Sequence, residues 1–452
     1  MPTAVDPLDG LALASAYANG ETDPVSVFEA ALERVPGNES TFISLTQARG
    51  LREAQASRAR WQAGAPLSAL DGVPIAWKDL FDLRGTVTTA GAACRRDAAP
   101  AEQDAALVQR LTQAGMVNLG KTNLSELAYS GLGLNPHFGT PGNPALAGAP
   151  RVPGGSSSGS AIAVAAGIVP IAMGTDTAGS IRIPAAFNGL VGYRASRKRY
   201  AFDGVFSLAR TLDALGPLTH SVRDALAIDH LLVNGPQRAP VQLRGLRLRV
   251  DEATLADPRV EPAVRRNLEH CLEHLGEAGA VIDRSPVRAW QATLQSIAEQ
   301  GWLGAAEAFA LHEQLLDSSA AEQLDPRVRK RLEAARGLPA STQLRLYAQR
   351  AQLQAQLKVE LAGALLVTPT VAHVAPERRP LEQNDALFVS TNLATLRLTM
   401  PGSLLDMPGV AMPSGCDAAG LPTGWLLAGC SGDDDYVLRA ALAVEQLFTS
   451  VV

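Results

Sequence analysis

Two short segments concentrate serine, glycine and threonine in a pattern that suits acyl-transfer chemistry. The first runs from Gly154 to Ser160 with the sequence GGSSSGS, and the second runs from Thr177 to Arg182 with the sequence TAGSIR. Serine supplies a nucleophile, a proton relay or a hydrogen-bond donor, and glycine lets a backbone amide approach a reacting carbonyl closely. Two such segments in one chain predict a serine-based acyl-transfer site.

A serine nucleophile needs a base within hydrogen-bond reach, and none of the seven histidines falls in or beside the two segments. Ser180 also lacks the Gly-x-Ser-x-Gly pattern of a nucleophile elbow, which argues against a Ser-His-Asp triad. A lysine can act as the base when burial lowers its pKa toward neutrality. Lys78 and Lys121 each follow a short apolar run, and the residues alone leave the choice between them open.

The composition predicts a protein that is folded throughout, because 46% of the residues are hydrophobic and 19% are charged. A formal charge of −5 and the lack of a long basic run argue against a nucleic-acid partner. The four cysteines have no Cys-x-x-Cys spacing, which favours structural thiols over disulfides or a zinc site, so we expect no metal.

The sequence contains no sign of a membrane segment or of a secretory signal. Its longest apolar run, residues 161–174, is shorter than the roughly 20 residues that span a bilayer. No basic residue precedes Arg34, and no apolar signal core follows it. We therefore expect a cytoplasmic protein that does not associate with membranes.

Alternating helical and strand patterns predict an α/β fold. Short apolar runs predict strands over 73–77, 116–120, 168–173, 245–251 and 364–369, and helical patterns cover 24–35, 51–61, 104–111, 158–167 and 261–275. The stretch 288–360 has few helix breakers and predicts a helical insertion that shapes a substrate pocket. Its Trp290, Trp302 and Phe309 could line that pocket or simply anchor helices to the core.

The chain shows no internal repeat or low-complexity linker that would divide it. We expect one domain overall, in which an N-terminal helical segment (residues 1–60) packs on a catalytic region (residues 61–452).

Several longer motifs together resemble the amidase signature family. They are GVPIAWKD at 72–79, the serine-glycine segment at 154–160 and GTDTAGSIRIPAA at 174–186. The resemblance extends through KTNLSE at 121–126, GTPGNP at 139–144 and GLPTGW at 420–425, and covers roughly residues 25–447. It implies an α/β/α sandwich with a mixed central β-sheet surrounded by helices.

The resemblance also assigns roles to particular residues. It implies a Ser-cisSer-Lys triad in which Ser180 is the nucleophile, Ser156 is the bridging serine and Lys78 is the base. Neutral Lys78 would accept the proton of Ser180 through Ser156 and return it to the departing nitrogen. An acyl-enzyme would form and then be hydrolysed.

The oxyanion hole implied by the resemblance consists of the backbone amides of Thr177, Ala178, Gly179 and Ser180. Asp176 and Arg182 would hold this loop, either as an ordinary ion pair or in contact with substrate. Many family members have glycine where this chain has Ala178, so we expect a negative φ or modest strain there. Ser157, like Ser158 and Ser160, is expected to support the site by satisfying backbone groups or capping the following helix.

These features predict a cofactor-free amidase that forms a seryl acyl-enzyme and releases ammonia or an amine from a small-molecule amide. Side activity on esters is expected, and the protein could be a homodimer. Two alternatives remain within the family: hydrolysis of small ureido acids of the allophanate or biuret type, and the glutaminase subunit of a tRNA-dependent amidotransferase, which would need a partner. A degenerate scaffold is disfavoured because Lys78, Ser156 and Ser180 are all present.

Overall fold

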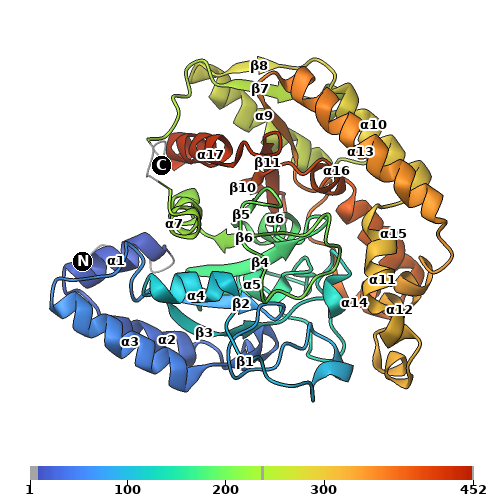
Figure 1. The fold of residues 1–452 in the computed structure, drawn as a ribbon. Coiled ribbons are helices and arrows are strands. Elements are labelled where there is room, and N and C mark those ends of the chain that lie inside the picture. Colours follow the sequence, from blue (N-terminus) through green and yellow to red (C-terminus); the bar gives the residue numbers. More distant parts are fainter. Residues whose placement is uncertain (1–8, 236–238, 450–452) are drawn as a thin grey trace.

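The computed structural model describes residues 9–235 and 239–449, which form a mixed eleven-stranded sheet with helices packed on both faces (Figure 1). The strand order is β1-β3-β2-β4-β6-β5-β10-β11-β9-β7-β8. The pairs β3–β2, β2–β4, β9–β7 and β7–β8 are parallel, and all other neighbours are antiparallel. The structure therefore confirms the α/β fold class and the mixed central sheet.

The strands are short and most are buried along their whole length. Their bounds are β1 Phe42–Leu45, β2 Pro74–Lys78, β3 Val117–Thr122, β4 Ile171–Asp176, β5 Val191–Arg194, β6 Ala214–Thr219, β7 Arg247–Val250, β8 Val281–Asp283, β9 Leu365–Pro369, β10 Gly409–Cys416 and β11 Pro422–Ala428.

Successive side chains of the central strands enter two different hydrophobic clusters. In β2, Ala76 belongs to one cluster while Ile75 and Trp77 belong to the other, and in β4 Ala172 is separated in the same way from Met173. This follows from the two-residue period of a strand, and it explains why these runs are continuously apolar. The sheet is thus the middle layer between two layers of helices.

The helices divide between these two faces. The cluster that contains Ala76 includes side chains of α2 (Pro24–Glu33), α5 (Ser158–Ala165), α6 (Arg182–Asn188), α10 (Arg288–Gln300), α13 (Ala340–Leu361) and α16 (Met400–Leu404). The cluster that contains Trp77 includes side chains of α1 (Gly10–Ala18), α4 (Ala106–Gln113), α7 (Val222–Val233), α9 (Pro262–Glu277) and α17 (Asp434–Thr449). The remaining helices include α3 (Gln47–Gln62), α8 (Glu252–Leu255), α11 (Gly304–Leu316), α12 (Pro326–Glu333), α14 (Arg378–Gln383) and α15 (Asp385–Leu396).

All ten helices and strands whose bounds were predicted are present, and their ends differ from the prediction by a few residues. The largest shifts are in β4, which begins three residues later than predicted and continues to Asp176, and in α3, which begins at Gln47 instead of residue 51. Pro170 lies just before β4, where it can precede a strand but cannot donate a ladder hydrogen bond. The stretch 288–360 is mostly helical, as predicted, and α10 to α13 lie together on the right of Figure 1.

The first 60 residues contribute more than the predicted helical segment. Their strand β1 pairs antiparallel with β3 and forms one edge of the sheet. The proposed division near residue 60 stays a prediction. Within the described residues the four cysteines are free, and no helix is both long and apolar enough to span a bilayer.

Candidate active site

Lys78 is the last residue of β2 and its side chain is completely buried. Its Nζ lies 2.6 Å from Ser156 Oγ and 2.7 Å from Thr175 Oγ1. No carboxylate oxygen of the described residues lies within 4 Å of this nitrogen. The amine is therefore surrounded by hydroxyl groups in a site closed to water.

Burial lowers the pKa of Lys78 to about 7, because a charged ammonium loses its hydration there. The carboxylates of Asp176 and Asp213 act in the opposite direction, at distances too long for an ion pair. A large fraction of Lys78 is consequently neutral at physiological pH, which is the form that can accept a proton.

Lys121 occupies a different environment, although it is also buried. Its Nζ forms an ion pair with Asp79 Oδ1 at 2.6 Å and donates hydrogen bonds to Thr88 Oγ1 and the Val87 carbonyl. Burial lowers the pKa of Lys121 and raises the pKa of Asp79, while the attraction between the two groups opposes both shifts. The ion pair gives Lys121 a structural role. Of the two lysines that the sequence left open, only Lys78 contacts a serine of the serine-glycine segment.

Ser156 and Ser180 converge next to the end of β2. Ser156 is fully buried, and the Gly155–Ser156 peptide bond is cis, in agreement with the family resemblance. Ser157 N donates to the Ser180 carbonyl at 3.2 Å, which joins the two serine segments directly. The Ser180 side chain makes no hydrogen bond with another described residue, and 4% of Ser180 remains exposed. Its hydroxyl is therefore available to a substrate.

The 177–180 loop connects β4 to α6 and carries the four amides named from the family resemblance. Three of them, those of Thr177, Ala178 and Ser180, donate to no other described group. The fourth is engaged, because Gly179 N donates to Asp176 Oδ1 at 2.9 Å. Gly179 therefore differs from the expectation: its amide holds the loop instead of being free for an oxyanion.

Glycine is required at position 179 by both conformation and space. Its φ is +134°, and a Cβ there would lie 2.2 Å from Thr399 Oγ1. Ala178, in contrast, is absent from the residues with positive φ, as expected for a residue with a side chain. Thr399 also donates its hydroxyl to the Ala178 carbonyl at 2.6 Å, so it fixes the loop from the opposite side.

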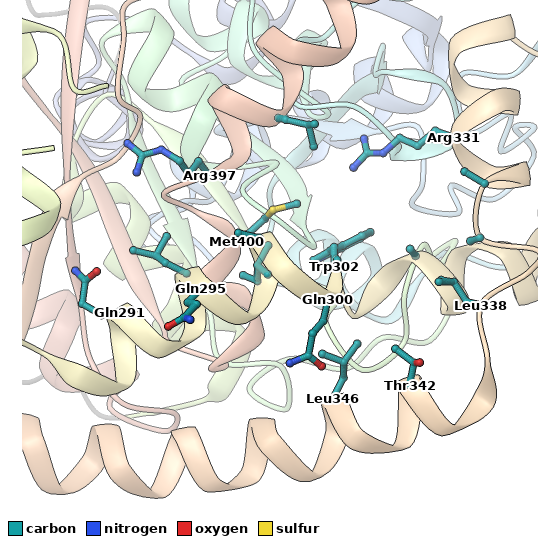
Figure 2. A pocket seen from close by; sticks show the side chains of 18 of the residues that line it. Gln291, Gln295, Gln300, Trp302, Arg331, Leu338, Thr342, Leu346, Arg397 and Met400 are labelled. Atoms are coloured by element: carbon teal, nitrogen blue, oxygen red, sulfur yellow. The ribbon is translucent and has the colours of Figure 1, made fainter. Parts of the chain in front are cut away.

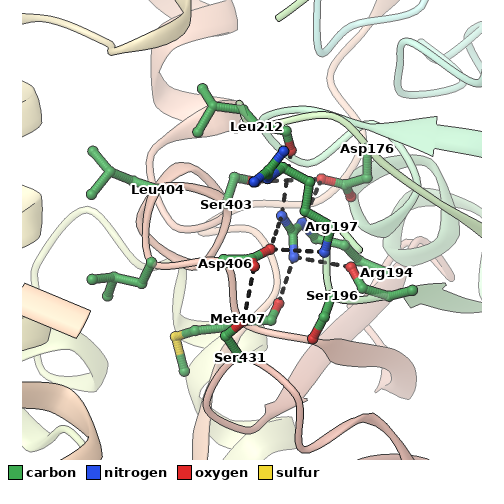
Figure 3. Close-up of polar contacts among 12 residues, drawn as sticks. Asp176, Arg194, Ser196, Arg197, Leu212, Ser403, Leu404, Asp406, Met407 and Ser431 are labelled. Carbon is green, nitrogen blue, oxygen red and sulfur yellow. Dashed lines mark hydrogen bonds and ion pairs between the residues drawn. The ribbon is translucent and has the colours of Figure 1, made fainter. Parts of the chain in front are cut away.

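Asp176 anchors the same loop through a buried charge network (Figure 3). Its carboxylate accepts hydrogen bonds from the amides of Gly179 and Ile181 and from the guanidinium of Arg182, at 2.9 to 3.1 Å. Arg194 approaches from β5 at 3.7 Å and pairs at 3.4 Å with Asp406. These cations lower the pKa of Asp176 to about 2, against the effect of burial. Asp176 and Arg182 form a structural pair in this arrangement.

The neighbouring serines satisfy backbone groups, as expected, with one exception. Ser157 Oγ donates to the Thr175 carbonyl at 3.3 Å, and Ser160 Oγ donates to the Met173 carbonyl at 3.0 Å. Of the two expected roles, Ser157 therefore satisfies a backbone group and does not cap α5, since its side chain makes no capping bond. The exception is Ser158, whose Oγ is buried without a hydrogen-bond partner among the described residues.

Sequence reasoning missed several side chains that build this site: Thr175, Arg194, Asp213 and Thr399. Asp213 Oδ1 accepts a hydrogen bond from Thr177 Oγ1 at 2.7 Å. None of these residues stands out by type or spacing, and Thr399 and Arg194 meet the loop only through tertiary contacts. Only Thr175 lies within a motif that the sequence analysis identified, the segment 174–186.

A cavity of about 790 Å³ lies among α10, α12 and α13 (Figure 2), and none of its lining residues belongs to the 177–180 loop. Two of its lining residues are close in sequence to residues of the active site. Met400 directly follows Thr399, and Tyr129 precedes by two residues Gly131, whose carbonyl accepts a hydrogen bond from Gly155 N. Trp302 is part of the wall, whereas Trp290 and Phe309 pack against the core. No group of three or more histidine, cysteine or acidic side chains in the described ranges could hold a metal ion.

Comparison with known proteins identifies the family. The amidase family model matches residues 26–438. A 2-amino-5-chloromuconic acid deaminase from Comamonas testosteroni is 33% identical over 85% of this chain and 83% of its own length. One subunit of the glutamyl-tRNA(Gln) amidotransferase from Symbiobacterium thermophilum is 31% identical over 95% of both chains. A crystal structure of an amidase, 31% identical, superposes with a TM-score of 0.84 over 98% of this chain and 100% of that one.

The chain therefore belongs to the amidase family, with the amidase signature fold. It is a hydrolase that acts on amide C–N bonds.

Proposed function

We propose that this amidase cleaves a carboxamide through an acyl-enzyme on Ser180, with Ser156 and Lys78 as the proton relay. The observation that carries this proposal is the contact of 2.6 Å between Lys78 Nζ and Ser156 Oγ in a fully buried site without a neighbouring carboxylate. A buried amine with a pKa of about 7 is suited to accept and return a proton near neutral pH.

In the proposed catalytic cycle, every proton that leaves one group is accepted by another. Ser180 Oγ attacks the carbonyl carbon, its proton passes to Ser156 Oγ, and the Ser156 proton passes to Lys78 Nζ. The tetrahedral intermediate then collapses, and Lys78 returns the proton through Ser156 to the departing nitrogen, so that ammonia or an amine leaves. Water attacks the acyl-enzyme by the same relay and releases the carboxylic acid.

The free amides of Thr177, Ala178 and Ser180 would stabilise the negative charge that develops on the carbonyl oxygen. Loss of one donor from such a site typically lowers the rate about 100-fold or more. The 177–180 loop is held in place before substrate arrives, by Asp176 on one side and Thr399 on the other. This arrangement needs little reorganisation during the reaction.

The triad is tested with the variants Ser180→Ala and Lys78→Ala, assayed for ammonia release from amides and for hydrolysis of a p-nitrophenyl ester. We expect both to lose at least about 1,000-fold in kcat, because nucleophile and base act as a unit. In the wild type, kcat/KM should rise with pH through about 7 as Lys78 loses its proton. Mass spectrometry should detect an acyl adduct on Ser180.

Ser158→Ala provides the matched control, since Ser158 lies in the same segment and its hydroxyl has no partner. This variant should keep wild-type kcat. The triad assignment fails if Ser158→Ala is as damaging as Ser180→Ala, or if Lys78→Ala retains most of its activity.

We further propose that the substrate carries a carboxylate, which Arg331 binds in the cavity of Figure 2. Arg331 extends from α12 toward the cavity interior, stacks over the Tyr129 ring at 4.3 Å and donates to the Tyr129 carbonyl at 2.9 Å. No carboxylate of the described residues lies within 4 Å of it, whereas Arg397 in the same cavity is paired with Asp257 at 3.0 Å. A fixed guanidinium without a counter-ion favours an anionic ligand group.

One relative agrees with an acidic substrate, because the Comamonas deaminase is named for a muconic acid, whereas the second, from Symbiobacterium, is named as a subunit of an amidotransferase. The second relative supports the alternative that this chain is a glutaminase subunit with a partner. Glutamine, allophanate and biuret therefore belong in the substrate panel. The cytoplasmic location and a homodimeric state stay predictions from the sequence.

The carboxylate site is tested by comparing an amide that bears a carboxylate, succinamic acid, with neutral butyramide. In Arg331→Gln, kcat/KM for succinamic acid should fall about 10- to 100-fold, mainly through KM, and that for butyramide should change little. Lys330→Gln, an exposed neighbour on α12, is the control and should match the wild type. Equal losses on both substrates would show that Arg331 has only a structural role.

A further inference from the structure

A second cavity, of about 770 Å³, lies between α13, the turn after β5 and the loops around residues 406 and 431. Its basic side chains are Arg197, Lys198, Arg199, Arg350 and Lys358, and its acidic side chains are Asp406 and Asp434. Five cations against two carboxylates leave a positive excess of three, although the whole chain carries −5. We call this space the basic cavity.

The two carboxylates of the basic cavity are already engaged by other groups. Asp434 Oδ1 accepts from the Tyr193 hydroxyl and from Ser196 N, both at 2.7 Å. Asp406 accepts from Arg197 N at 2.9 Å and from Ser431 Oγ at 2.8 Å (Figure 3). Neither carboxylate is therefore free to neutralise the remaining cations.

Four of the five cations lack a carboxylate within 4 Å in the part of the chain that the structure describes. Only Arg199 has carboxylates this close, since it pairs with Asp229 at 2.5 Å and with Asp434 at 3.9 Å. The unpaired ones are Arg197, Lys198, Arg350 and Lys358, with the two lysines exposed at the rim. Like charges gathered in a concave, partly desolvated space repel one another and favour an anionic occupant.

Of the two unpaired arginines, Arg350 is held in position by the protein. Arg350 donates from Nε to the Leu404 carbonyl at 2.6 Å and from Nη1 to the Thr211 carbonyl at 2.9 Å, which leaves Nη2 without a partner among the described residues. Arg197 Nε is buried and has no hydrogen-bond partner among the described residues, while Arg197 Nη1 donates to the Arg210 carbonyl at 3.4 Å. Burial lowers the pKa of Arg350, and the neighbouring Arg197 and Arg194 lower it further while Asp406 opposes them.

We propose that the basic cavity binds a small oxyanion with at least two negative charges, of the phosphate-ester or polycarboxylate class, and that this ligand stabilises the active-site loop through residues 399–406. The charge-assisted bonds of two neighbouring guanidinium groups, of which Arg350 is held in place by the protein, suit such oxygens. The volume admits a ligand of metabolite size.

Residues 399–406 connect the basic cavity to the 177–180 loop. At the start of this segment, Thr399 donates to the Ala178 carbonyl, and Ser403 accepts from Arg182 at 2.8 Å. At its end, the Leu404 carbonyl accepts from Arg350, and Asp406 pairs with Arg194. A ligand that relieves the repulsion around Arg350 would strengthen these end contacts and, through them, the position of the loop.

The site is tested by calorimetric titration of the protein with pyrophosphate and with citrate, at constant ionic strength in chloride. We expect saturable binding to the wild type and an increase in Tm with pyrophosphate. The double variant Arg197→Gln/Lys358→Gln should raise Kd at least tenfold, while Lys330→Gln, outside the cavity, should leave Kd unchanged. Circular dichroism verifies that the variants are folded, and Lys198→Gln provides a milder second variant with an intermediate Kd.

Binding does not depend on the proposed triad, so the inactive Ser180→Ala variant should bind pyrophosphate like the wild type. In the active enzyme, saturating pyrophosphate should change kcat for an amide at least twofold, and the double variant should lose this response. An unchanged Kd in the double variant would overturn the site, and an unchanged wild-type kcat would overturn its coupling to the loop. Binding of an acidic peptide but of neither small anion would overturn the ligand class.

Discussion

At the scale of single residues, the site depends on the Lys78 amine, which is largely uncharged because the folded structure buries it. Lys78 and Lys121 are both buried lysines at the carboxyl ends of neighbouring parallel strands, but only Lys121 has a carboxylate partner. The absence of a counter-ion at Lys78 lets burial lower its pKa to about 7. The same feature that makes Lys78 a suitable base must reduce the stability of the fold.

This cost should be visible as a pH dependence of stability. The unfolded chain binds a proton at Lys78 up to about pH 10.5, whereas the folded chain releases it near pH 7, so the free energy of unfolding rises with pH between these values. Relative to Lys78→Met, the wild type should gain roughly 5 kcal/mol across this window. Urea unfolding at pH 7, 8.5 and 10 measures the difference.

Lys330→Met is the control for this experiment, because Lys330 is exposed. Its stability relative to the wild type should stay constant with pH. A constant difference for Lys78→Met as well would mean that Lys78 keeps its ordinary pKa, which would contradict its role as a neutral base.

At the scale of elements, the decisive feature is the loop between β4 and α6. Its conformation needs a glycine at 179, it is anchored internally by Asp176, and it is braced by Thr399 at the start of α16. The loop is therefore positioned by an element that lies more than 200 residues away in the sequence.

Gly179→Ala should abolish activity by displacing this loop. The added Cβ meets Thr399 and forces an unfavourable positive φ, so we expect kcat to fall at least about 100-fold and stability to fall by about 1–3 kcal/mol. Gly142→Ala is the matched control, since a Cβ there has open space and its φ is not positive. Kinetics and thermal unfolding of both variants provide the test, and near-normal kcat in Gly179→Ala would refute a fixed loop.

At the scale of the whole molecule, buried charges join parts of the chain that are distant in sequence. Asp176 at the end of β4 pairs with Arg182 in α6, and Arg194 in β5 and Asp406 after α16 extend this pair into one network between the sheet and its helical layer. Figure 3 shows the part of the network that contains Asp176, Arg194 and Asp406. Removing one member of such a network leaves the others buried without compensation.

Asp176→Asn should therefore destabilise the protein by about 3–5 kcal/mol at pH 7. Because folding lowers the pKa of Asp176 to about 2, its contribution is complete above about pH 4 and is lost as the pH falls through about 2. Between pH 4 and pH 3, the free energy of unfolding of Asp176→Asn should therefore fall less than that of the wild type, as measured by urea unfolding at pH 7, 4 and 3. Asp283 forms a surface ion pair with Arg249, so Asp283→Asn is the control. It should change the free energy of unfolding by less than about 1 kcal/mol.

The fold was predictable where the sequence pattern is local. The runs that became β2 and β4 are continuously apolar because the sheet is buried on both faces. The helices α2 and α9 follow from their periodicity, and α5 follows from its alanine-rich, apolar composition. β6 was missed because Gly216 and Pro217 disfavour a strand by propensity. Gly216 is needed there because a Cβ would lie 1.8 Å from the Tyr193 carbonyl, which only the packed sheet reveals.

The sequence by itself determined the chemistry available to this protein: two serine-glycine segments, two lysines after apolar runs, and a pattern that resembles one family of amidases. Only the tertiary structure decided which lysine contacts a serine, which amides remain free and which distant side chains hold the 177–180 loop. Residue types and spacing are local properties, whereas the pKa of Lys78, the pairing of Lys121 and the position of Thr399 depend on neighbours that folding brings together.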